Sequence, residues 1–417
     1  MNPKPGFINA PNVVIAGGKT SHYVKCKGLH KSWLKMNDLM RGKKDFMKTI
    51  QVGTDNKNDC LVKCSPGKKC VIHLHSKTGA MFEKHIRDMA KKILADQGIK
   101  KMHITIQEYG ALDYVIKSRI EAALEKAVGT PIGTDPISRK STTKNQARRT
   151  RLYVPGNNPR MVTPAGIYGS DCIIFDLEDS VTVDQKDAAR YLVKNALRNL
   201  DFGDSELWVR INKNSIDKDL FQVLQGSPHG ICIPKVETPE DIVTVEKRVE
   251  DVTGKVKLMP IIESAQGIIN APQIASASKH IVALAFGAED LTRDLGGERS
   301  WETLLHPRSV LVLAAKASGI QALDTIYPDT RDEQGLRDET KKIKAMGFDG
   351  KGVIHPDQIT PIHDCFTPSS DEIMKAKAIV KALREAKKKG RGTASLNGKM
   401  IDEPVEKKAK KILSLTK

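Results

Sequence analysis

The sequence predicts an α/β protein in which a (β/α)8 TIM barrel and a C-terminal extension follow a small α/β domain. Three observations lead to this fold class. After residue 150, eight short apolar segments recur, most of them with helical stretches between, as parallel strands buried on both faces require. No glycine-rich phosphate turn follows the first of them, which disfavours a doubly wound sheet. Charge and pattern also change near residue 150.

Charge separates the N-terminal third from the rest of the chain. Residues 1–150 carry 29 Lys and Arg against 12 Asp and Glu, whereas residues 151–417 carry 39 against 38. A basic module therefore precedes a nearly neutral body. Seven cysteines at irregular spacings argue against a disulfide framework, and no apolar run approaches the ~18 residues of a membrane helix. We expect an intracellular protein without a membrane segment.

The first 128 residues divide into an extension and a module. Residues 1–45 are basic and acid-poor like an organellar targeting segment but rich in lysine rather than arginine, so mitochondrial matrix and cytoplasm stay equally open. In residues 46–128, "CVIHLHS" and "KMHITIQE" alternate like half-buried strands. The stretches "FEKHIRDMAKKILADQG" and "LDYVIKSRIEAALEKAVG" carry apolar residues at helical spacing. We therefore predict a small α/β module there.

Residues 129–147 are polar and contain two prolines, which predicts a linker. The barrel is expected over residues 148–365, and a helical C-terminal extension over residues 366–417. The eight predicted strands lie in the segments "RLYVPG", "DCIIFDLED", "LWVRIN", "GICIPKVE", "KLMPIIES", "IVALAFGAED", "QALDTIYPD" and "KGVIHP".

Acids end two consecutive predicted strands, Glu263 after the fifth and Asp290 after the sixth. Barrel active sites form where the strands end, so these two carboxylates would be neighbours on one rim. Neighbouring carboxylates repel each other unless one keeps a proton or a hard divalent cation such as Mg²⁺ lies between them. The alternative is that each caps the helix that follows it. The residues alone leave both interpretations open.

Three further polar residues end predicted strands. Arg210 ends the third, where it would capture a substrate carboxylate or pair with Glu178 or Asp179, and the two roles can coexist. Lys235, at the end of the fourth strand, has the same two interpretations. His355, after the eighth, is either a packed rim residue or a ligand.

Several segments together resemble one enzyme family: "RRTRLYVPGNN", "DCIIFDLEDSV", "VRIN", "PIIESAQGI", "FGAEDLTRDL", "GFDGKGVIHPDQI" and "SLNGKMIDEPV". In this order they resemble the β subunit of citrate lyase and the citramalyl-CoA and malyl-CoA lyases of the HpcH/HpaI aldolase group. The resemblance runs from about Arg148 to the C-terminus. It implies a Mg²⁺-dependent carbon–carbon lyase that cleaves a citryl-, citramalyl- or malyl-type thioester to an acetyl thioester and an oxo acid.

The resemblance also implies residue roles. Glu263 and Asp290 would hold Mg²⁺, Arg210 would bind a substrate carboxylate, and the backbone N–H groups of Gly287 and Ala288 would contact the same acid. Positions matched to acyl-CoA or substrate contacts are Tyr153, Arg160, Ile354 and His355. One further lysine used by some relatives aligns with Pro164, so part of the thioester contact is not carried over.

Asp402 matches the proton-transfer residue of the family. In relatives this aspartate belongs to a C-terminal extension that folds over the barrel of a neighbouring subunit, which implies a homotrimer. Without the resemblance, Asp402 would be read as a solvated acid in "IDEPVEKKAKK".

The module in front resembles the γ subunit of citrate lyase, an acyl carrier protein, mainly at "GALDYVIKSRIEAAL". Lys57 stands where that carrier has the serine to which its prosthetic arm is attached, and an amine cannot form the phosphodiester. We therefore expect a lyase that uses free CoA thioesters, with a citrate lyase α-type subunit as a candidate partner. The rival hypothesis is a non-catalytic RNA- or assembly-binding protein that uses the basic N-terminal third. No RNA-binding signature supports it, so nucleic acid is not an expected partner.

Overall fold

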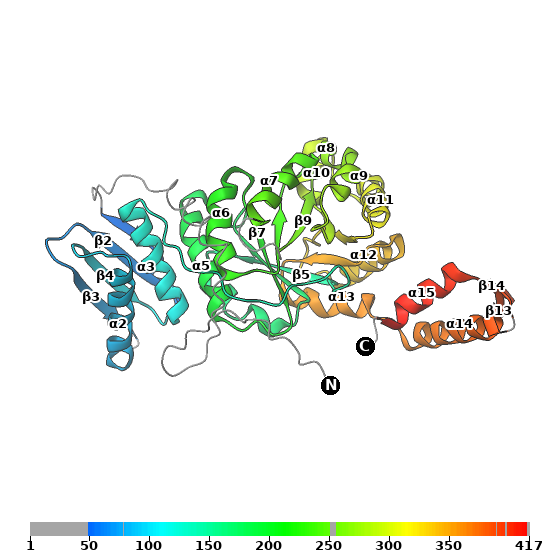
Figure 1. The fold of residues 1–417 in the computed structure, drawn as a ribbon, viewed down its shortest axis with the longest axis horizontal. Helices are drawn as coiled ribbons and strands as arrows, with labels where there is room; N and C mark the ends of the chain where they lie inside the picture. The colour runs from blue at the N-terminus through cyan, green and yellow to red at the C-terminus, as the bar shows by residue number, and fades with distance from the viewer. Residues whose placement is uncertain (1–48, 78, 251–255, 389, 397, 415–417) are drawn as a thin grey trace, which may run out of the picture.

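The computed structural model describes residues 49–77, 79–250, 256–388, 390–396 and 398–414 (Figure 1). The predicted basic extension, residues 1–45, lies outside the described residues. An N-terminal α/β module, a barrel and a C-terminal extension follow one another along the chain. None of the described helices is long and apolar enough to cross a membrane, and the six described cysteines are free thiols.

The N-terminal module is a four-stranded sheet with two helices. Its strands, in spatial order, are β1 (Ile50–Val52), β2 (Cys60–Ser65), β4 (His103–Glu108) and β3 (Val71–Ser76). Only the β3–β4 pair is parallel. The helices are α2 (Ala80–Asp96) and α3 (Asp113–Val128). β1 and β2 are not among the predicted strands. β1 has only three residues, too few to show a period, and the buried face of β2 carries Cys60, Val62 and Cys64, of which only one is a strongly apolar residue.

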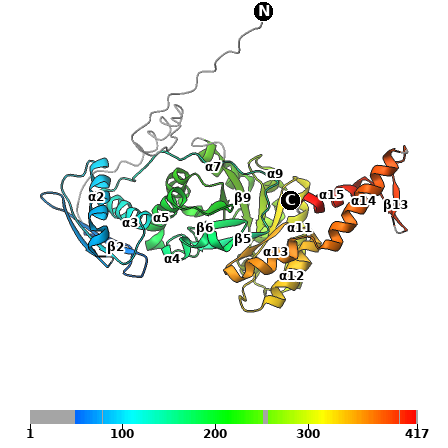
Figure 2. The same ribbon diagram turned by 90° about the horizontal axis from the view of Figure 1, so that it is seen from below.

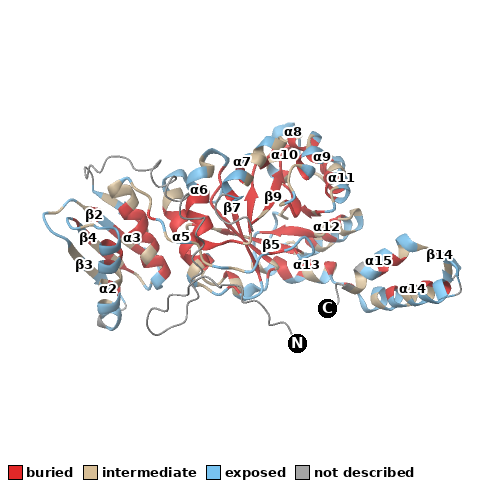
Figure 3. Cartoon of the chain, in the orientation of Figure 1, coloured by how far each residue is buried: buried red, intermediate tan, exposed pale blue. Residues whose placement is uncertain are grey.

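The predicted eight-stranded barrel is confirmed. Eight parallel strands close in the order β10-β11-β12-β5-β6-β7-β8-β9. They are β5 (Thr150–Pro155), β6 (Cys172–Asp176), β7 (Glu206–Arg210), β8 (Gly230–Ile233), β9 (Lys257–Ile262), β10 (Ala283–Phe286), β11 (Gln321–Asp324) and β12 (Gly350–Val353). Ile174, Trp208, Met259 and Leu323 fill the interior, and a larger cluster fills the space between strands and helices. Both faces of the strands are therefore buried, which explains their nearly continuous apolar sequence (Figure 3).

Helices surround the barrel: α4 (Pro159–Val162), α5 (Lys186–Asn199), α6 (Ile216–Val223), α7 (Pro239–Glu250), α8 (Ala265–Ile269), α9 (Ala271–Ser276), α10 (Ala288–Leu295), α11 (Trp301–Ala317), α12 (Glu333–Met346) and α13 (Ile359–Phe366). Short 3-10 turns are η1 (Ala165–Tyr168), η2 (Val183–Gln185), η3 (Lys213–Ser215), η4 (Leu224–Gly226) and η5 (Pro356–Gln358).

The module packs on the barrel through α3 and α5, and both helices are largely buried where they meet (Figure 3). The contact is polar as well as apolar. Glu121 of α3 accepts from Lys194 Nζ at 2.8 Å and from Asn195 Nδ2 at 2.9 Å on α5. Both partners of the Glu121–Lys194 ion pair are almost fully buried. Separating the two helices would therefore break an ion pair that is shielded from water.

Residues 129–147 contain no helix or strand, yet they are held against the barrel. The Ile132 N–H donates to the Tyr191 hydroxyl at 2.8 Å, and Arg139 Nε donates to the Ser227 carbonyl at 2.8 Å. Backbone and side-chain hydrogen bonds therefore hold this polar segment on the barrel surface, along which it runs to β5.

The C-terminal extension projects away from the barrel beyond α13 (Figures 1 and 2). It consists of α14 (Ser370–Lys388), the hairpin β13 (Ala394–Leu396) and β14 (Lys399–Ile401), and α15 (Glu403–Ser414). α15 packs back along α14, with a 2.7 Å ion pair between Lys387 and Glu406. Most of its surface is exposed (Figure 3).

Candidate active site at the carboxyl ends of the barrel strands

Glu263 lies directly after β9 and is 5% exposed. Its Oε1 accepts a hydrogen bond from the Lys235 N–H at 2.7 Å. Its other oxygen faces Gly287, where an added Cβ would lie 2.5 Å from Oε2, so only glycine fits. Burial raises the pKa of Glu263 to about 8, and the charges of Glu178 and Asp290 add to the effect. A carboxyl held in this way keeps its proton at neutral pH unless a cation replaces it.

Asp290 lies in the first turn of α10, which begins directly after β10. β9 and β10 are paired, with Ile262 opposite Phe286, so the chain leaves both strands at the same rim. The structure therefore brings Glu263 and Asp290 together, and the Asp290 charge reaches the Glu263 carboxyl. In the single chain, Asp290 forms an ion pair with Arg293, whose side chain is 75% exposed.

Arg210 forms a bidentate pair with Asp176, a partner that the sequence analysis does not identify. Its Nε and Nη2 donate to the two carboxylate oxygens at 2.7 and 2.8 Å. Its Nη1 also lies 3.2 Å from Glu178 and 3.3 Å from Asp179, the predicted structural partners. Burial alone would raise the pKa of Asp176, but the hydrogen bonds from Arg210 outweigh it and hold that pKa below its usual value. The two residues are directly opposite in the β6–β7 register, which is the signal that could have identified the pair.

Lys235 connects the acids of the rim. Its φ of +53° is rare for a residue with a side chain. In this conformation its N–H points at Glu263 while its ammonium lies 2.7 Å from Glu178 Oε1. Burial raises the pKa of Glu178, whose buried Oε2 has no hydrogen bond among the described residues and only the 3.2 Å ion-pair contact with Arg210. The strained backbone of Lys235 is typical of functional sites.

The donors at this rim suit a hard cation. Glu263 and Asp290 offer carboxylate oxygens from adjacent strands, and Glu178 contributes a further buried oxygen nearby. The charged groups that most affect the Glu263 carboxyl are Glu178, Asp290 and Arg210. Oxygen-only donors with excess negative charge fit Mg²⁺ better than zinc.

The predicted backbone donors at Gly287 and Ala288 already have protein acceptors. The Gly287 N–H donates to the Ile262 carbonyl at 3.0 Å, and the Ala288 N–H donates to Thr325 Oγ1 at 3.2 Å. The N–H groups of Glu289 and Asp290, in the same first turn of α10, have no intrahelical partner by helix geometry. They are therefore additional candidates for contact with an acid at this rim.

The remaining predicted substrate contacts come from the neighbouring strands β5 and β12. The ring of Tyr153 lies 5.4 Å from Arg210 Cζ, close enough for a cation–π contact. Ile354 and His355 follow β12, and both of their N–H groups donate to Gln358 Oε1, at 3.0 and 3.4 Å. Their turn is therefore held rigidly beside Tyr153's strand.

Arg160 and Asp402 stand apart from this group. Arg160 is exposed on α4, where its N–H donates to Asn158 Oδ1 at 3.1 Å. Asp402 follows β14 and accepts from the Val405 N–H at 3.2 Å, which caps α15. Because the β13–β14 hairpin projects away from the barrel, a single chain does not bring Asp402 to its own rim (Figures 1 and 2).

Comparison with known families gives two matches along the chain. Residues 149–356 match the HpcH/HpaI aldolase/citrate lyase family. Residues 47–127 match an acyl carrier protein family described as the malonate decarboxylase delta subunit (MdcD). The two matches confirm the predicted order of a carrier-like module before a barrel of the aldolase group.

Individual relatives match over most of their length. The citrate lyase subunit beta of Leuconostoc mesenteroides subsp. cremoris is 42% identical over 64% of this chain and 93% of the relative. The mitochondrial citramalyl-CoA lyase of Rattus norvegicus is 34% identical over 71% of this chain and 93% of the relative. The structure of CitE from Mycobacterium tuberculosis in complex with magnesium, acetoacetate and coenzyme A is 30% identical, with a TM-score of 0.55, and covers 66% of this chain and 99% of that one.

Proposed function

The chain belongs to the HpcH/HpaI aldolase/citrate lyase family, and we propose that it is a Mg²⁺-dependent carbon–carbon lyase that cleaves a hydroxyacyl-CoA thioester. The citryl-, citramalyl- and malyl-CoA thioesters are the substrates to be compared. Relatives named for this chemistry, with 93% of their length matched, support the reaction class.

The observation that carries the proposal is the buried carboxyl of Glu263 beside Asp290. Its pKa of about 8 means that the site stabilises negative charge poorly without a cation. We propose that Glu263 and Asp290 hold the metal through their oxygens. When bound, Mg²⁺ would polarise the oxygens of the oxo or hydroxy acid as a Lewis acid.

The chain's own residues would bind and orient the substrate. Cleavage removes the proton of the substrate hydroxyl and breaks the carbon–carbon bond as the oxo-acid carbonyl forms. The electron pair of the broken bond remains on the thioester as an enolate. Protonation of the enolate carbon then gives the acetyl group. Arg210, held in a fixed plane by the bonds of its Nε and Nη2 to Asp176, would bind the substrate carboxylate through its remaining Nη1 and Nη2 N–H groups. Tyr153, stacked beside Arg210, would exclude water from that side.

We propose that Asp402 reaches the rim of another copy of the chain. There it would transfer a proton at the acetyl methyl carbon or at the substrate hydroxyl. The extension that carries it has few contacts with its own barrel and exposes large apolar side chains, Met374 at 61% and Met400 at 70%. Exchange of this extension among three copies would complete each site, as in the proposed homotrimer. In the single chain the Asp402 carboxylate rests as a helix cap instead.

We further propose that the carrier-like module is a fixed part of the enzyme and carries no prosthetic arm. Arg119 pairs with Asp59 at 2.8 Å while it donates to the Asn157 carbonyl at 3.1 Å, in the loop after β5. Lys57 lies two residues before Asp59 and is exposed. The loop that would hold an arm is thus bound to Arg119 by an ion pair within the module, and the hydrogen bond from Arg119 to Asn157 connects it to the loop after β5. A carrier that visits several sites needs a weaker contact, which favours free CoA thioesters.

The test is an assay of acetyl-CoA release from citramalyl-, malyl- and citryl-CoA by the full chain, with Mg²⁺ and with EDTA. Turnover of one thioester that requires Mg²⁺ supports the proposal. Asp290→Asn should lower kcat by 100-fold or more, since a metal ligand is worth several kcal/mol of barrier. Lys57→Ala should keep full activity with CoA thioesters.

Two outcomes would reject parts of this scheme. Activity that is unchanged in EDTA or in Asp290→Asn would remove the metal assignment. Activity only with a carrier-bound thioester, lost in Lys57→Ala, would restore a carrier role for the module.

Mixing inactive Asp402→Asn with inactive Asp290→Asn chains should recover activity if sites are shared between copies.

A further inference from the structure

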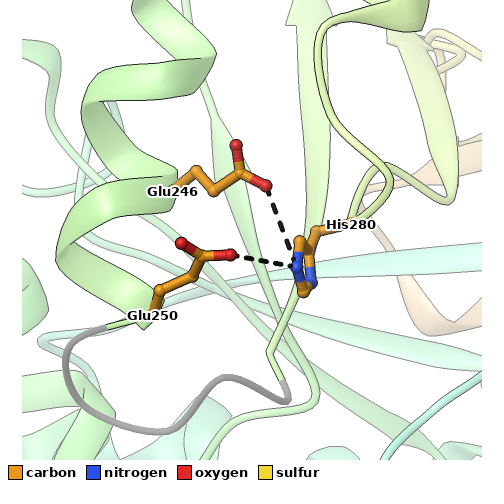
Figure 4. Close-up of side chains that lie close together, drawn as sticks. All are labelled: Glu246, Glu250 and His280. Atoms are coloured by element: carbon orange, nitrogen blue, oxygen red, sulfur yellow. Dashed lines mark ion pairs between the residues drawn. The ribbon is translucent and has the colours of Figure 1, made fainter.

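Three potential metal ligands converge at the other end of the barrel, near the amino ends of the strands. Glu246 and Glu250, one turn apart on α7, point toward His280 in the segment before β10 (Figure 4). One ligand atom of each residue lies within 4.8 Å of the other two. None of the three belongs to the rim described above.

The distances fit ligands around an ion better than a direct ion pair. His280 Nε2 lies 3.4 Å from Glu250 Oε1 and 3.8 Å from Glu246 Oε1. A charge-assisted N–H···O bond would be about 2.7–2.9 Å. Two ligands at about 2.0–2.1 Å from a tetrahedral zinc ion stand about 3.4 Å apart. His280 Nε2 is buried, and neither carboxylate forms a hydrogen bond with it, so the nitrogen faces the two carboxylates without a bond.

Hydrogen bonds outside the cluster fix the positions of Glu246 and His280. Ser278 Oγ donates to Glu246 Oε1 at 2.5 Å and accepts from the His280 N–H at 3.0 Å. The His280 carbonyl accepts from the Leu258 N–H at 3.0 Å, at the start of β9. One hydroxyl therefore orients the carboxylate and fixes the histidine backbone, as outer contacts do at metal sites.

We propose that Glu246, Glu250 and His280 form a second divalent-cation site, one that takes a borderline ion such as Zn²⁺ with water in the remaining position. One imidazole and two carboxylates suit zinc better than Mg²⁺. The Glu250 side chain is 51% exposed, which gives an ion access from solvent. The six residues of β9 separate this site from Glu263 by roughly 20 Å. Its effect should be on stability, because residues at this face of a barrel serve the fold.

The site can be tested on the full chain after all bound metal has been removed. Excess Mg²⁺ is then added to occupy the rim site. Co²⁺ is titrated by equilibrium dialysis and by its visible absorption, and Zn²⁺ by thermal unfolding. The variants are His280→Gln and Glu250→Gln. The matched control is His306→Gln, which changes an exposed histidine on α11.

Wild type and His306→Gln should bind one Co²⁺ that both site variants lose or bind at least tenfold more weakly. Zn²⁺ should raise the unfolding temperature of the first two proteins only. Equal Co²⁺ stoichiometry and affinity in all four proteins would overturn the proposal, as would a wild type that binds no such ion. If His280→Gln does not fold, Glu250→Gln decides, because its half-exposed side chain can be replaced without disturbing the core.

Discussion

Replacing Glu263 with glutamine should stabilise the metal-free protein at pH 8 and do so much less at pH 5. Burial raises the pKa of this carboxyl from 4.5 to about 8. Below pH 4.5 the group is protonated in both the folded and the unfolded chain, and the stability associated with its raised pKa is fully present. As the pH rises toward 8, the unfolded chain releases its proton first, so this stability is progressively lost. Glutamine is neutral throughout and does not lose it.

The magnitude follows from the size of the pKa shift. One pKa unit corresponds to about 1.36 kcal/mol, so the shift at Glu263 costs on the order of 4 kcal/mol at pH 8 and roughly 1 kcal/mol at pH 5. Binding of Mg²⁺ reverses the effect, because the cation needs the ionised carboxylate. At pH 7 each Mg²⁺ bound should therefore release about one proton.

Thermal and urea unfolding at pH 5, 6, 7 and 8 in EDTA would measure the difference. The exposed Glu385→Gln serves as the control for loss of one charge. Calorimetric titration of Mg²⁺ in buffers of different ionisation enthalpy would count the protons released. Parallel pH profiles for wild type and Glu263→Gln, or Mg²⁺ binding without proton release, would refute the reasoning.

Three other substitutions test neighbouring features. Arg210→Lys keeps the charge but loses the bidentate geometry, so kcat/KM should fall by about 100-fold in the acetyl-CoA assay. The unfolding temperature should also fall, because lysine cannot replace both bonds to the buried Asp176; unchanged kinetics would exclude the substrate contact of Arg210. Arg119→Met leaves the buried Asp59 carboxylate without its ion-pair partner and should cost about 3–5 kcal/mol in urea unfolding. It also removes the hydrogen bond to Asn157, so proteolysis between module and barrel should be faster; an unchanged proteolysis rate would contradict the fixed docking. Gly287→Ala should displace Glu263 and lower Mg²⁺ affinity at least tenfold. The control Gly297→Ala, whose added Cβ meets its nearest atom at 3.8 Å, should bind Mg²⁺ normally. Equal affinity in both variants would show that Gly287 is not needed.

Sequence patterns were sufficient for the barrel and for the position of its acids. Parallel strands buried on both faces must be apolar almost throughout, so they stand out as short runs. A carboxylate at the end of such a run must lie at the carboxyl rim, which placed Glu263 and Asp290 together. The module was recognised less completely, since β1 is too short to show a period.

The contacts between distant segments could not be read from the chain. Asp176 lies 34 residues before Arg210 and becomes its partner only through the β6–β7 register. His280 likewise meets Glu246 only because α7 returns the chain to the amino end of β9, next to β10.

By itself, the sequence determined which segments would be buried and which residues end them, because hydrophobicity and its periodicity are local properties of the chain. The tertiary structure alone decided the protonation of Glu263, the fixed plane of Arg210 and the docking of the module on α5. These depend on desolvation and on charges brought close by packing, and both are set by neighbours that are far away in sequence.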